Sequence, residues 1–220
     1  MVASRDSDVR ADLVTGDGLA EAIATADVVV LLASNPHDPD GVDVGGTRNL
    51  LDVLEDQHLV YLSIVGVDRH PLPYYRAKHH AERMIEDSGH PHSILRATQF
   101  HSFVEWRLLG WCHRYLALVP EGYVFQPVAV EEVATELATI STGPPRELAP
   151  DFAGPEILTL TDLARSFLTA RGIETPLLSY PKLGSVAAGY RAGLHTNANR
   201  AVGVKTWAGY LSDRFGQQLP

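Results

Sequence analysis

The stretch DVVVLLAS, residues 27–34, is a short and continuous run of β-branched and aliphatic residues. A run of this kind, without alternating polar positions, is typical of a strand buried on both faces of a parallel sheet. The run HLVYLSIVG, residues 58–66, has the same character, and HSILRA, residues 92–97, gives a weaker signal of the same type. The sequence therefore predicts three parallel strands in its first hundred residues.

Helix-forming patterns precede each of these strands, at residues 18–26, 44–57 and 73–89. Thr47 is a candidate N-cap for the second helix, and a glycine follows the third. Alternating strands and helices indicate βαβ units, and right-handed crossovers then place helices on both faces of the sheet. We expect an α/β fold of the Rossmann type, a doubly wound and mainly parallel sheet with a smaller C-terminal part.

After residue 100 the alternation loosens. Further helices are predicted at residues 100–118, 128–141, 159–172 and 205–215, the third capped by Thr159. The segment 142–156 is rich in proline and glycine and indicates a surface connection. We accordingly expect a domain over residues 1–143 and a smaller C-terminal region over residues 144–220.

The charge, the cysteine content and the histidine spacing of the chain argue against several classes of protein. The 220-residue chain has a net charge of −9, and its 18 basic residues form no basic run, so we expect no direct contact with nucleic acid. Cys112 is the single cysteine, which fits a reducing cytoplasm, and the longest apolar run is too short to cross a membrane. The ten histidines lack the spacing of metal ligands, so no metal site is expected.

The segment PLPYYRAKHHAE, residues 71–82, carries a candidate catalytic pair. Tyr74 and Lys78 lie four residues apart, on one face of the predicted helix. A lysine ammonium there would stabilise a phenolate, and a tyrosine with a lowered pKa could exchange a proton with a carbonyl or alcohol. Ser63, at the end of the preceding strand, could hydrogen-bond the same oxygen. The alternative is a solvated lysine beside a packed tyrosine; Tyr75 has only His79 at the corresponding position.

The residues from VDVGGTRNLLDVL through HLVYLSIVGVDRHPLPYYRAKHHAE to SILRATQFH resemble the atypical short-chain dehydrogenases/reductases, a group that includes the NmrA-like NAD(P)-binding proteins. The resemblance spans the chain in outline and is densest over residues 27–101. It implies a Rossmann-type NAD(P)-binding domain over residues 1–143 and a substrate-binding region over residues 144–220. It also implies Tyr74 as the acid/base, Lys78 as its partner and Ser63 as a donor to the substrate oxygen.

The same resemblance implies the residues that border the cofactor, NADP or NAD. Asp12 and Leu13 match the turn that touches the adenine, and the basic Arg5 after Ser4 favours the 2′-phosphate of NADP. Lys78 would hold the nicotinamide ribose. The remaining residues that would line the cofactor are Leu32, Ala33, Ser34, Ala97, Thr98, Gln99 and Phe100.

A dinucleotide-binding fold normally opens with a strand and a glycine-rich turn that receives the pyrophosphate at a helix N-terminus. The only comparable segment, GDGLAE at residues 16–21, has Glu21 at the third glycine position, so we interpret it as an ordinary turn. The sequence thus corresponds to a fold that starts inside the second strand, without the central first one. We expect the sheet to close up, another chain to fill the slot, or the intact product to be longer at its N-terminus.

Further residues carry two interpretations each. His101 could line a substrate pocket or lie at the surface. Phe103 belongs to an aromatic group that forms either an apolar substrate wall or ordinary helix packing. Asn49 could hold a backbone bulge and a proton-relay water or be a polar helix residue near the sheet edge.

The resulting hypothesis is an NAD(P)H-dependent oxidoreductase that acts on a small carbonyl or alcohol, as a monomer or homodimer. The alternatives are a non-catalytic dinucleotide-binding redox sensor and a truncated chain with impaired cofactor binding.

Overall fold

The computed structural model describes residues 3–4 and 9–216, which divide into two compact units. Unit 1 comprises the described residues up to Ser63, then Leu72–Arg96 and Glu136–Pro150. Unit 2 comprises Ile64–Pro71, Ala97–Thr135 and the described residues from Asp151 onward. The units interleave along the chain, and the expected domain boundary after residue 143 stays a prediction.

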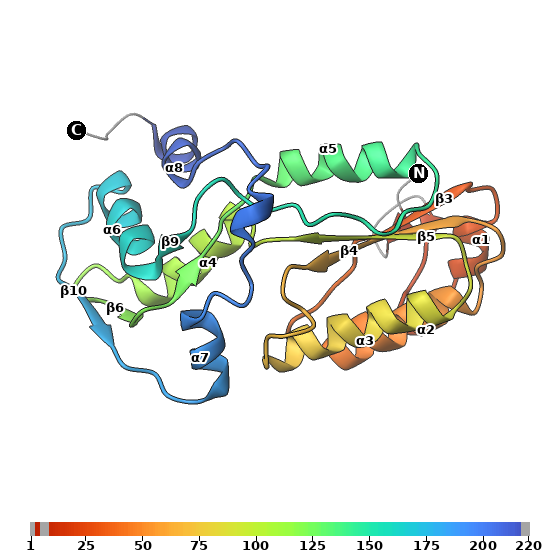
Figure 1. Ribbon diagram of the computed structural model, residues 1–220, viewed down its shortest axis with the longest axis horizontal. Helices are drawn as coiled ribbons and strands as arrows, with labels where there is room; N and C mark the ends of the chain where they lie inside the picture. Colours follow the sequence, from red (N-terminus) through yellow and green to blue (C-terminus); the bar gives the residue numbers. More distant parts are fainter. Residues whose placement is uncertain (1–2, 5–8, 217–220) are drawn as a thin grey trace. The chain divides into compact units, whose positions relative to one another are not determined.

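A four-stranded sheet forms the centre of unit 1 (Figure 1). Its strand order is β3 (Val28–Leu31), β4 (His58–Ile64), β5 (His92–Ala97) and β8 (Glu147–Leu148). β3 pairs with β4 and β5 pairs with β8, both in parallel. The apolar runs predicted β3, β4 and β5. β4 and β5 are mostly buried, as expected, but β3 is not buried on both faces, since only Leu31 of its four residues is fully buried. The α/β class and the mainly parallel sheet are confirmed.

The helices of unit 1 are α1 (Leu19–Ile23), the π-helix η1 (Asp40–Gly45), α2 (Gly46–Leu51) and α3 (Pro73–Asp87). α2 and α3 lie side by side along the sheet in Figure 1. They bury one apolar cluster with the strands, which includes Leu50, Leu59, Tyr61, Ile85 and Ile94. This packing fixes α3 against β4, the strand from which Ser63 projects.

The predicted helix at residues 44–57 was wrong in its bounds, and Thr47 is not an N-cap. Helical structure begins four residues earlier, after Pro39, the N-cap residue of η1. The proline ring fixes a φ angle close to that of a helix, and at a helix start the absent N–H of proline costs no intrahelical hydrogen bond. Thr47 instead lies inside α2 and its hydroxyl donates to the carbonyl of Asp43. The wider turn of η1 is a local irregularity that apolar periodicity does not reveal.

The sheet does not close up on the side of β3. Two short strands, β1 (Ala3–Ser4) and β2 (Val9–Arg10), pair with each other in a separate parallel sheet. The carbonyl of Asp27 accepts from the N–H of His58, so the backbone groups of Val28, Val30 and Leu32 point to the opposite edge. Among the described residues no strand pairs with that edge, and Val30 is 40% exposed.

Unit 2 contains two strand pairs and several helices. β6 (Ala117–Pro120) pairs in parallel with β10 (Leu177–Tyr180), and β7 (Val124–Phe125) pairs antiparallel with β9 (Leu158–Thr159). The helices are α4 (His101–Trp111), α5 (Val130–Ser141, which continues into unit 1), α6 (Leu160–Ala170), α7 (Ser185–Arg191), the 3₁₀ turn η2 (Ala198–Arg200) and α8 (Trp207–Phe215). The sequence predicted four of these helices but neither α7 nor the strand pairs.

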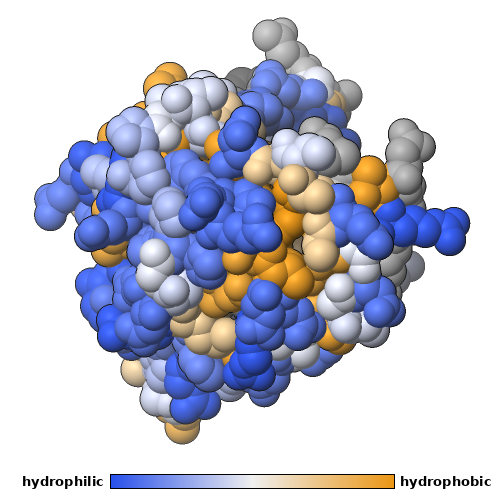
Figure 2. Space-filling view, turned by 90° about the vertical axis from the view of Figure 1, so that its right-hand side faces the viewer, coloured by the Kyte–Doolittle hydropathy of each residue, from blue (hydrophilic) through white to orange (hydrophobic). Residues whose placement is uncertain are grey.

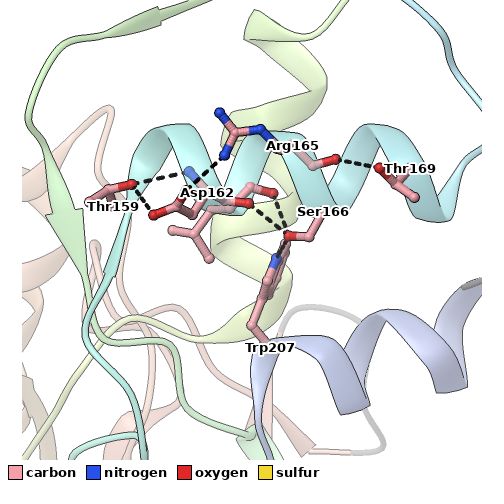
Figure 3. Close-up of polar contacts among 7 residues, drawn as sticks. Thr159, Asp162, Arg165, Ser166, Thr169 and Trp207 are labelled. Carbon is pink, nitrogen blue, oxygen red and sulfur yellow. Dashed lines mark hydrogen bonds and ion pairs between the residues drawn. The ribbon is translucent and has the colours of Figure 1, made fainter. Parts of the chain in front are cut away.

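Helix α6 shows why its prediction held. The Thr159 side chain accepts a hydrogen bond from the N–H of Asp162, as an N-cap should (Figure 3). From α8, the indole N–H of Trp207 donates to the Ser166 hydroxyl at 2.9 Å. Both helices bury apolar side chains in one cluster, which includes Leu163, Phe167 and Leu211. None of the helices in residues 9–216 is long and apolar enough to span a membrane.

Candidate active site

The candidate site lies in unit 1, where α3 presents Tyr74 and Lys78. Pro73 occupies the first turn of this helix and Leu72 is its extended N-cap residue, which fixes where the helix begins. Tyr74 is half-buried in the first turn, and Lys78 is 3% exposed one turn later. The structure thus excludes the solvated lysine that the sequence left open.

Three groups surround the Lys78 ammonium. Nζ donates to the carbonyl of Leu62 at 2.8 Å, lies 3.6 Å from Asp43 Oδ1, and sits 4.2 Å from the centre of the Tyr61 ring. Burial lowers the pKa of Lys78 to about 8, while the negative charges of Asp43 and Glu82 oppose that shift. The ammonium is therefore mostly charged at neutral pH and can lose its proton at little cost.

The Tyr74 hydroxyl belongs to a short chain of polar side chains. It lies 2.7 Å from Ser34 Oγ, and Ser34 in turn donates to Asp43 Oδ1 at 2.6 Å. Burial raises the pKa of Tyr74, the hydrogen bond with Ser34 lowers it, and the charge of Asp43 raises it. Tyr74 thus rests as a neutral phenol that carries a transferable proton. The expected lowering of its pKa is wrong for this structure, because burial outweighs the hydrogen bond with Ser34.

Ser63 lies near the carboxyl end of β4 and is 3% exposed. Its Oγ has no hydrogen-bond partner among the described residues, and neither has the hydroxyl of Tyr61, two residues earlier on the same face of the strand. A buried hydroxyl without a partner is costly, so it marks a position where a ligand oxygen would be favourable. The predicted role of Ser63 stays a prediction.

Asp43 is the polar residue of this site that the sequence did not indicate. It is 1% exposed, and its carboxylate accepts hydrogen bonds from Ser34 Oγ and from the backbone N–H of Asn35. The π-helix η1 carries Asp43 into the site. One interpretation of the sequence was that Asn49 supports a backbone bulge. The Asn49 side chain instead donates to the carbonyls of Leu13 and Val14 and holds that turn.

An apolar groove of about 480 Å³ runs along the open edge of β3. Figure 2 faces the side on which α1 and β3 lie in Figure 1, and shows apolar surface among hydrophilic residues there. The groove brings together Leu13, Leu32 and Ala33, all predicted to border the cofactor. A neighbouring hollow of about 320 Å³ is lined by Asp12, whose carboxylate accepts from the N–H of Val14.

The remaining predicted cofactor residues lie elsewhere. The backbone of Ser4 pairs with Arg10 in the β1–β2 sheet, and Arg5 is outside the described residues. The segment Ala97–Phe100 belongs to unit 2. There the Thr98 hydroxyl accepts from the N–H of Gly154, and the Gln99 amide donates to the carbonyl of His195.

The two predicted substrate-binding residues are also in unit 2. His101 is 2% exposed and its ring stacks on Tyr210, at 4.9 Å between centroids, with Trp207 beyond. Burial lowers the pKa of His101 to about 4, so the ring is neutral. Phe103 is 38% exposed and packs beside Trp106. The prediction that His101 and Phe103 contact a substrate stays a prediction.

The described residues fit the nicotinamide end of NAD(P) better than they fit its pyrophosphate. The unpartnered Ser63 hydroxyl, the Tyr74 phenol and the buried Lys78 ammonium are donors of the kind that a ribose and a carbonyl oxygen accept. The glycine turn at residues 16–21, the segment that the sequence offered for the phosphates, does not have this fit. Gly18 has a left-handed backbone, but a Cβ there would lie 2.3 Å from the carbonyl of Arg10, so it packs against β2. The helix that follows, α1, has only five residues.

Within the described part of the chain, no three histidine, cysteine, aspartate or glutamate side chains are grouped as metal ligands. The polar groups of the site are hydroxyls, one carboxylate and one ammonium, a set suited to proton transfer.

Comparison with known families agrees with this geometry. Residues 3–103 match the family model described as NAD(P)H-binding. This part of the chain is similar to NAD(P)H-binding domains. The match confirms NADP or NAD as the cofactor class and supports the resemblance to atypical short-chain dehydrogenases/reductases. The finer NmrA-like assignment stays a prediction. No curated protein sequence matches the chain significantly.

Solved structures show the same fold at low sequence identity. One is the NADPH-dependent quinone oxidoreductase QOR2 of Escherichia coli in complex with NADPH, with a TM-score of 0.78 and 16% identity over 94% of this chain and 83% of that one. A second is a nucleoside-diphosphate-sugar epimerase of Staphylococcus aureus, with a TM-score of 0.72 and 16% identity over 91% and 81%. A third is RMD of Pseudomonas aeruginosa in complex with NADPH, with a TM-score of 0.65 and 14% identity over 96% and 88%. At such identities these likenesses establish a Rossmann-like fold.

Proposed function

We propose that this protein is an NAD(P)H-dependent oxidoreductase that reduces a small carbonyl compound, or oxidises the corresponding alcohol. The observation that carries the proposal is the arrangement of Tyr74, Lys78 and Ser63. A phenol, a buried ammonium and an unpartnered buried hydroxyl gather where α3 packs on β4, in a domain of an NAD(P)H-binding family.

The bound cofactor would supply or accept the hydride, and the side chains of this site would manage the proton. As hydride reaches the carbonyl carbon, negative charge develops on the oxygen, and the Tyr74 hydroxyl gives its proton to that oxygen. The Lys78 ammonium, held by Leu62 and Asp43, stabilises the phenolate that remains. The Ser63 hydroxyl has no competing partner among the described residues and orients the oxygen by donating to it.

The groove beside β3 supports the placement of the adenine half of the cofactor. Leu13, Leu32 and Ala33 form an apolar wall of the kind that accepts a flat ring, and Asp12 lies in the adjoining hollow. The preference for NADP over NAD rests on Arg5, which lies outside the described residues. The substrate would be a small carbonyl, enone or alcohol, and quinones join the test panel because a structural neighbour is a quinone oxidoreductase.

The first test combines cofactor binding with turnover. The purified 220-residue chain is titrated with NADPH and with NADH, and binding is followed by fluorescence. Oxidation of whichever cofactor binds is then followed in the presence of a panel of quinones, enones and aldehydes. We expect Tyr74→Phe to lower kcat by about 100-fold or more, because it removes the general acid, while the Kd for cofactor changes little. Tyr115→Phe is the matched control, since Tyr115 is 85% exposed.

Each result has a defined meaning. A Tyr74→Phe variant that keeps the wild-type kcat would refute the role of Tyr74. Tight cofactor binding without turnover of any compound in the panel would favour a redox sensor. No binding at millimolar cofactor would mean that this chain by itself is not the working enzyme. The monomeric or dimeric state and the cytoplasmic location remain predictions, to be checked by light scattering and by fractionation.

A further inference from the structure

Helix α4 carries apolar side chains on both of its faces, although unit 2 covers only one of them. On the covered face Val104 and Leu108 are 1% and 0% exposed and belong to the apolar cluster of this unit. On the opposite face Phe103 and Trp106 are 38% and 55% exposed, and Leu109 is 44% exposed. A helix that is apolar all round is normally buried all round, so the outer face of α4 is of the kind that a further surface covers.

The turn after α4 adds two more large apolar side chains. The N–H of His113 donates to the carbonyl of Leu116 at 3.2 Å, so the backbone of the turn closes on itself. Tyr115 and Leu116 are 85% and 41% exposed. Among the described residues, the exposed phenylalanine, tryptophan and tyrosine side chains all lie in this segment. We call the surface formed by Phe103, Trp106, Leu109, Tyr115 and Leu116 the α4 face.

The charge of this segment is opposite to that of the chain as a whole. Residues 106–120 contain Arg107 and Arg114 and no aspartate or glutamate, whereas the net charge of the chain is −9. The Arg107 guanidinium lies 4.4 Å from the centre of the Trp111 ring and 5.7 Å from that of Trp106, and Arg114 is exposed. Neither arginine forms an ion pair with a described residue. The α4 face is therefore an apolar surface beside two positive charges, which complements an anionic surface.

We propose that the α4 face binds the surface of an anionic lipid bilayer, so that the protein attaches to a membrane peripherally. Tryptophan and tyrosine favour the level of the lipid headgroups, where the ring lies in an apolar region and its N–H or O–H reaches water. Leu109 and Leu116 enter the acyl boundary, and Arg107 and Arg114 meet the headgroup phosphates. This inference requires neither cofactor nor substrate and goes beyond the proposed function.

A second copy of this chain is the main alternative occupant. A two-fold dimer places the same face on both sides of its interface, so two copies of Arg107 and Arg114 would share it with no acidic residue of the segment 106–120 between them. A small-molecule site is the other alternative, but such sites are concave. The outer face of α4 is open, because a Cβ at Gly110 would have no atom within 4 Å apart from its chain neighbours and the backbone of its own helix. A flat anionic surface fits both observations.

Gly110 offers a position for the test. It lies four residues after Trp106 and therefore on the same side of the helix. Gly110→Lys and Gly110→Glu place a charge of either sign on the α4 face without a clash. Ala208→Lys and Ala208→Glu are the matched controls, because Ala208 is exposed on α8, which packs through Tyr210 against His101 on the covered side of α4.

Co-sedimentation of the purified 220-residue chain with vesicles measures the interaction directly. We expect binding to vesicles of phosphatidylcholine mixed with anionic phosphatidylglycerol, and little binding to phosphatidylcholine alone. Gly110→Lys should raise the partition coefficient by about fivefold and Gly110→Glu should lower it by about fivefold, because each places a charge near the bilayer surface. Trp106→Ala should lower it by about tenfold, since an apolar side chain is lost. At about 0.15 M salt the Ala208 variants should stay within about twofold of wild type.

Tryptophan fluorescence gives a second measurement. The chain has three tryptophans, and Trp207 is 3% exposed in the core of unit 2. A blue shift on addition of the anionic vesicles therefore reports Trp106 and Trp111. We expect the shift to be smaller in Trp106→Ala and unchanged in the Ala208 variants, and its absence in the wild-type chain would contradict the proposal.

The remaining outcomes separate the alternatives. No binding to the anionic vesicles, or equal effects of the Gly110 and Ala208 substitutions, would refute the proposal. A dimer that Trp106→Ala dissociates in light scattering, in a chain that binds no vesicles, would mean that a second copy covers the face. A chain that binds vesicles but no cofactor would support this inference and count against the proposed function. Circular dichroism identifies any variant that has lost its fold, and if Trp106→Ala is one, the two Gly110 variants decide.

Discussion

Glu82→Gln should destabilise unit 1 far more than the same change four residues along the helix. Glu82 is 1% exposed on α3 and receives two hydrogen bonds from the Arg96 guanidinium of β5, at 2.9 and 2.6 Å. The Arg96 side chain is only 14% exposed. The pair joins the helix that carries Tyr74 and Lys78 to the sheet.

The expected magnitude follows from this burial. Removing one partner of a buried ion pair costs about 3–5 kcal/mol. Because Arg96 keeps some access to water, we take the lower value, about 3 kcal/mol, which for a chain of this length lowers Tm by about 6–12 °C. Glu86 on the same helix pairs with Arg83, but the side chain of Arg83 is 60% exposed, so Glu86→Gln should cost less than about 1 kcal/mol.

Urea denaturation followed by circular dichroism measures both variants, which carry the same change in net charge. Glu82→Leu combined with Arg96→Met completes the design, since replacing both partners should cost less than removing one. If Glu82→Gln lowers the free energy of unfolding by no more than Glu86→Gln does, the pair does not hold α3 on the sheet. The argument from burial would then be refuted.

Two further predictions concern His101 and the edge of β3. Burial holds the pKa of His101 at about 4, below the ordinary 6.5, so the unfolded chain binds the extra proton first and stability falls as pH drops from about 6.5 to about 4. His101→Phe should remove at most about 3 kcal/mol of that loss, measured as urea midpoints at neutral and acid pH, and an unchanged pH slope would contradict the assignment. Val30→Lys places a charge on β3, at the edge with which no strand of the described residues pairs. It should reduce aggregation in light scattering with less than about 0.5 kcal/mol change in stability. A large loss of stability would mean that this edge is covered.

The sequence by itself determined the elements whose signals are local. The apolar runs of β3, β4 and β5, the proline at the start of α3 and the threonine cap of α6 are signals within a few residues. They reflect burial and the hydrogen-bonding needs of helix ends. The pairing of Tyr74 with Lys78 was visible for the same reason, because a helical repeat brings residues four apart onto one face. The bounds of η1 were missed, since an extra residue in a helical turn leaves no trace in apolar spacing.

Only the tertiary structure decided what surrounds that pair. Ser34 lies 40 residues before Tyr74 and nine before Asp43, and the three meet because a loop after β3, a π-helix and the start of α3 converge at one end of the sheet. Ser34 was noted as a cofactor neighbour from the resemblance, but nothing in the sequence distinguished Asp43 from a surface carboxylate. Its burial between Ser34 and Lys78 is a property of packing, because the free energy that selects a buried charge depends on partners that are distant in the chain.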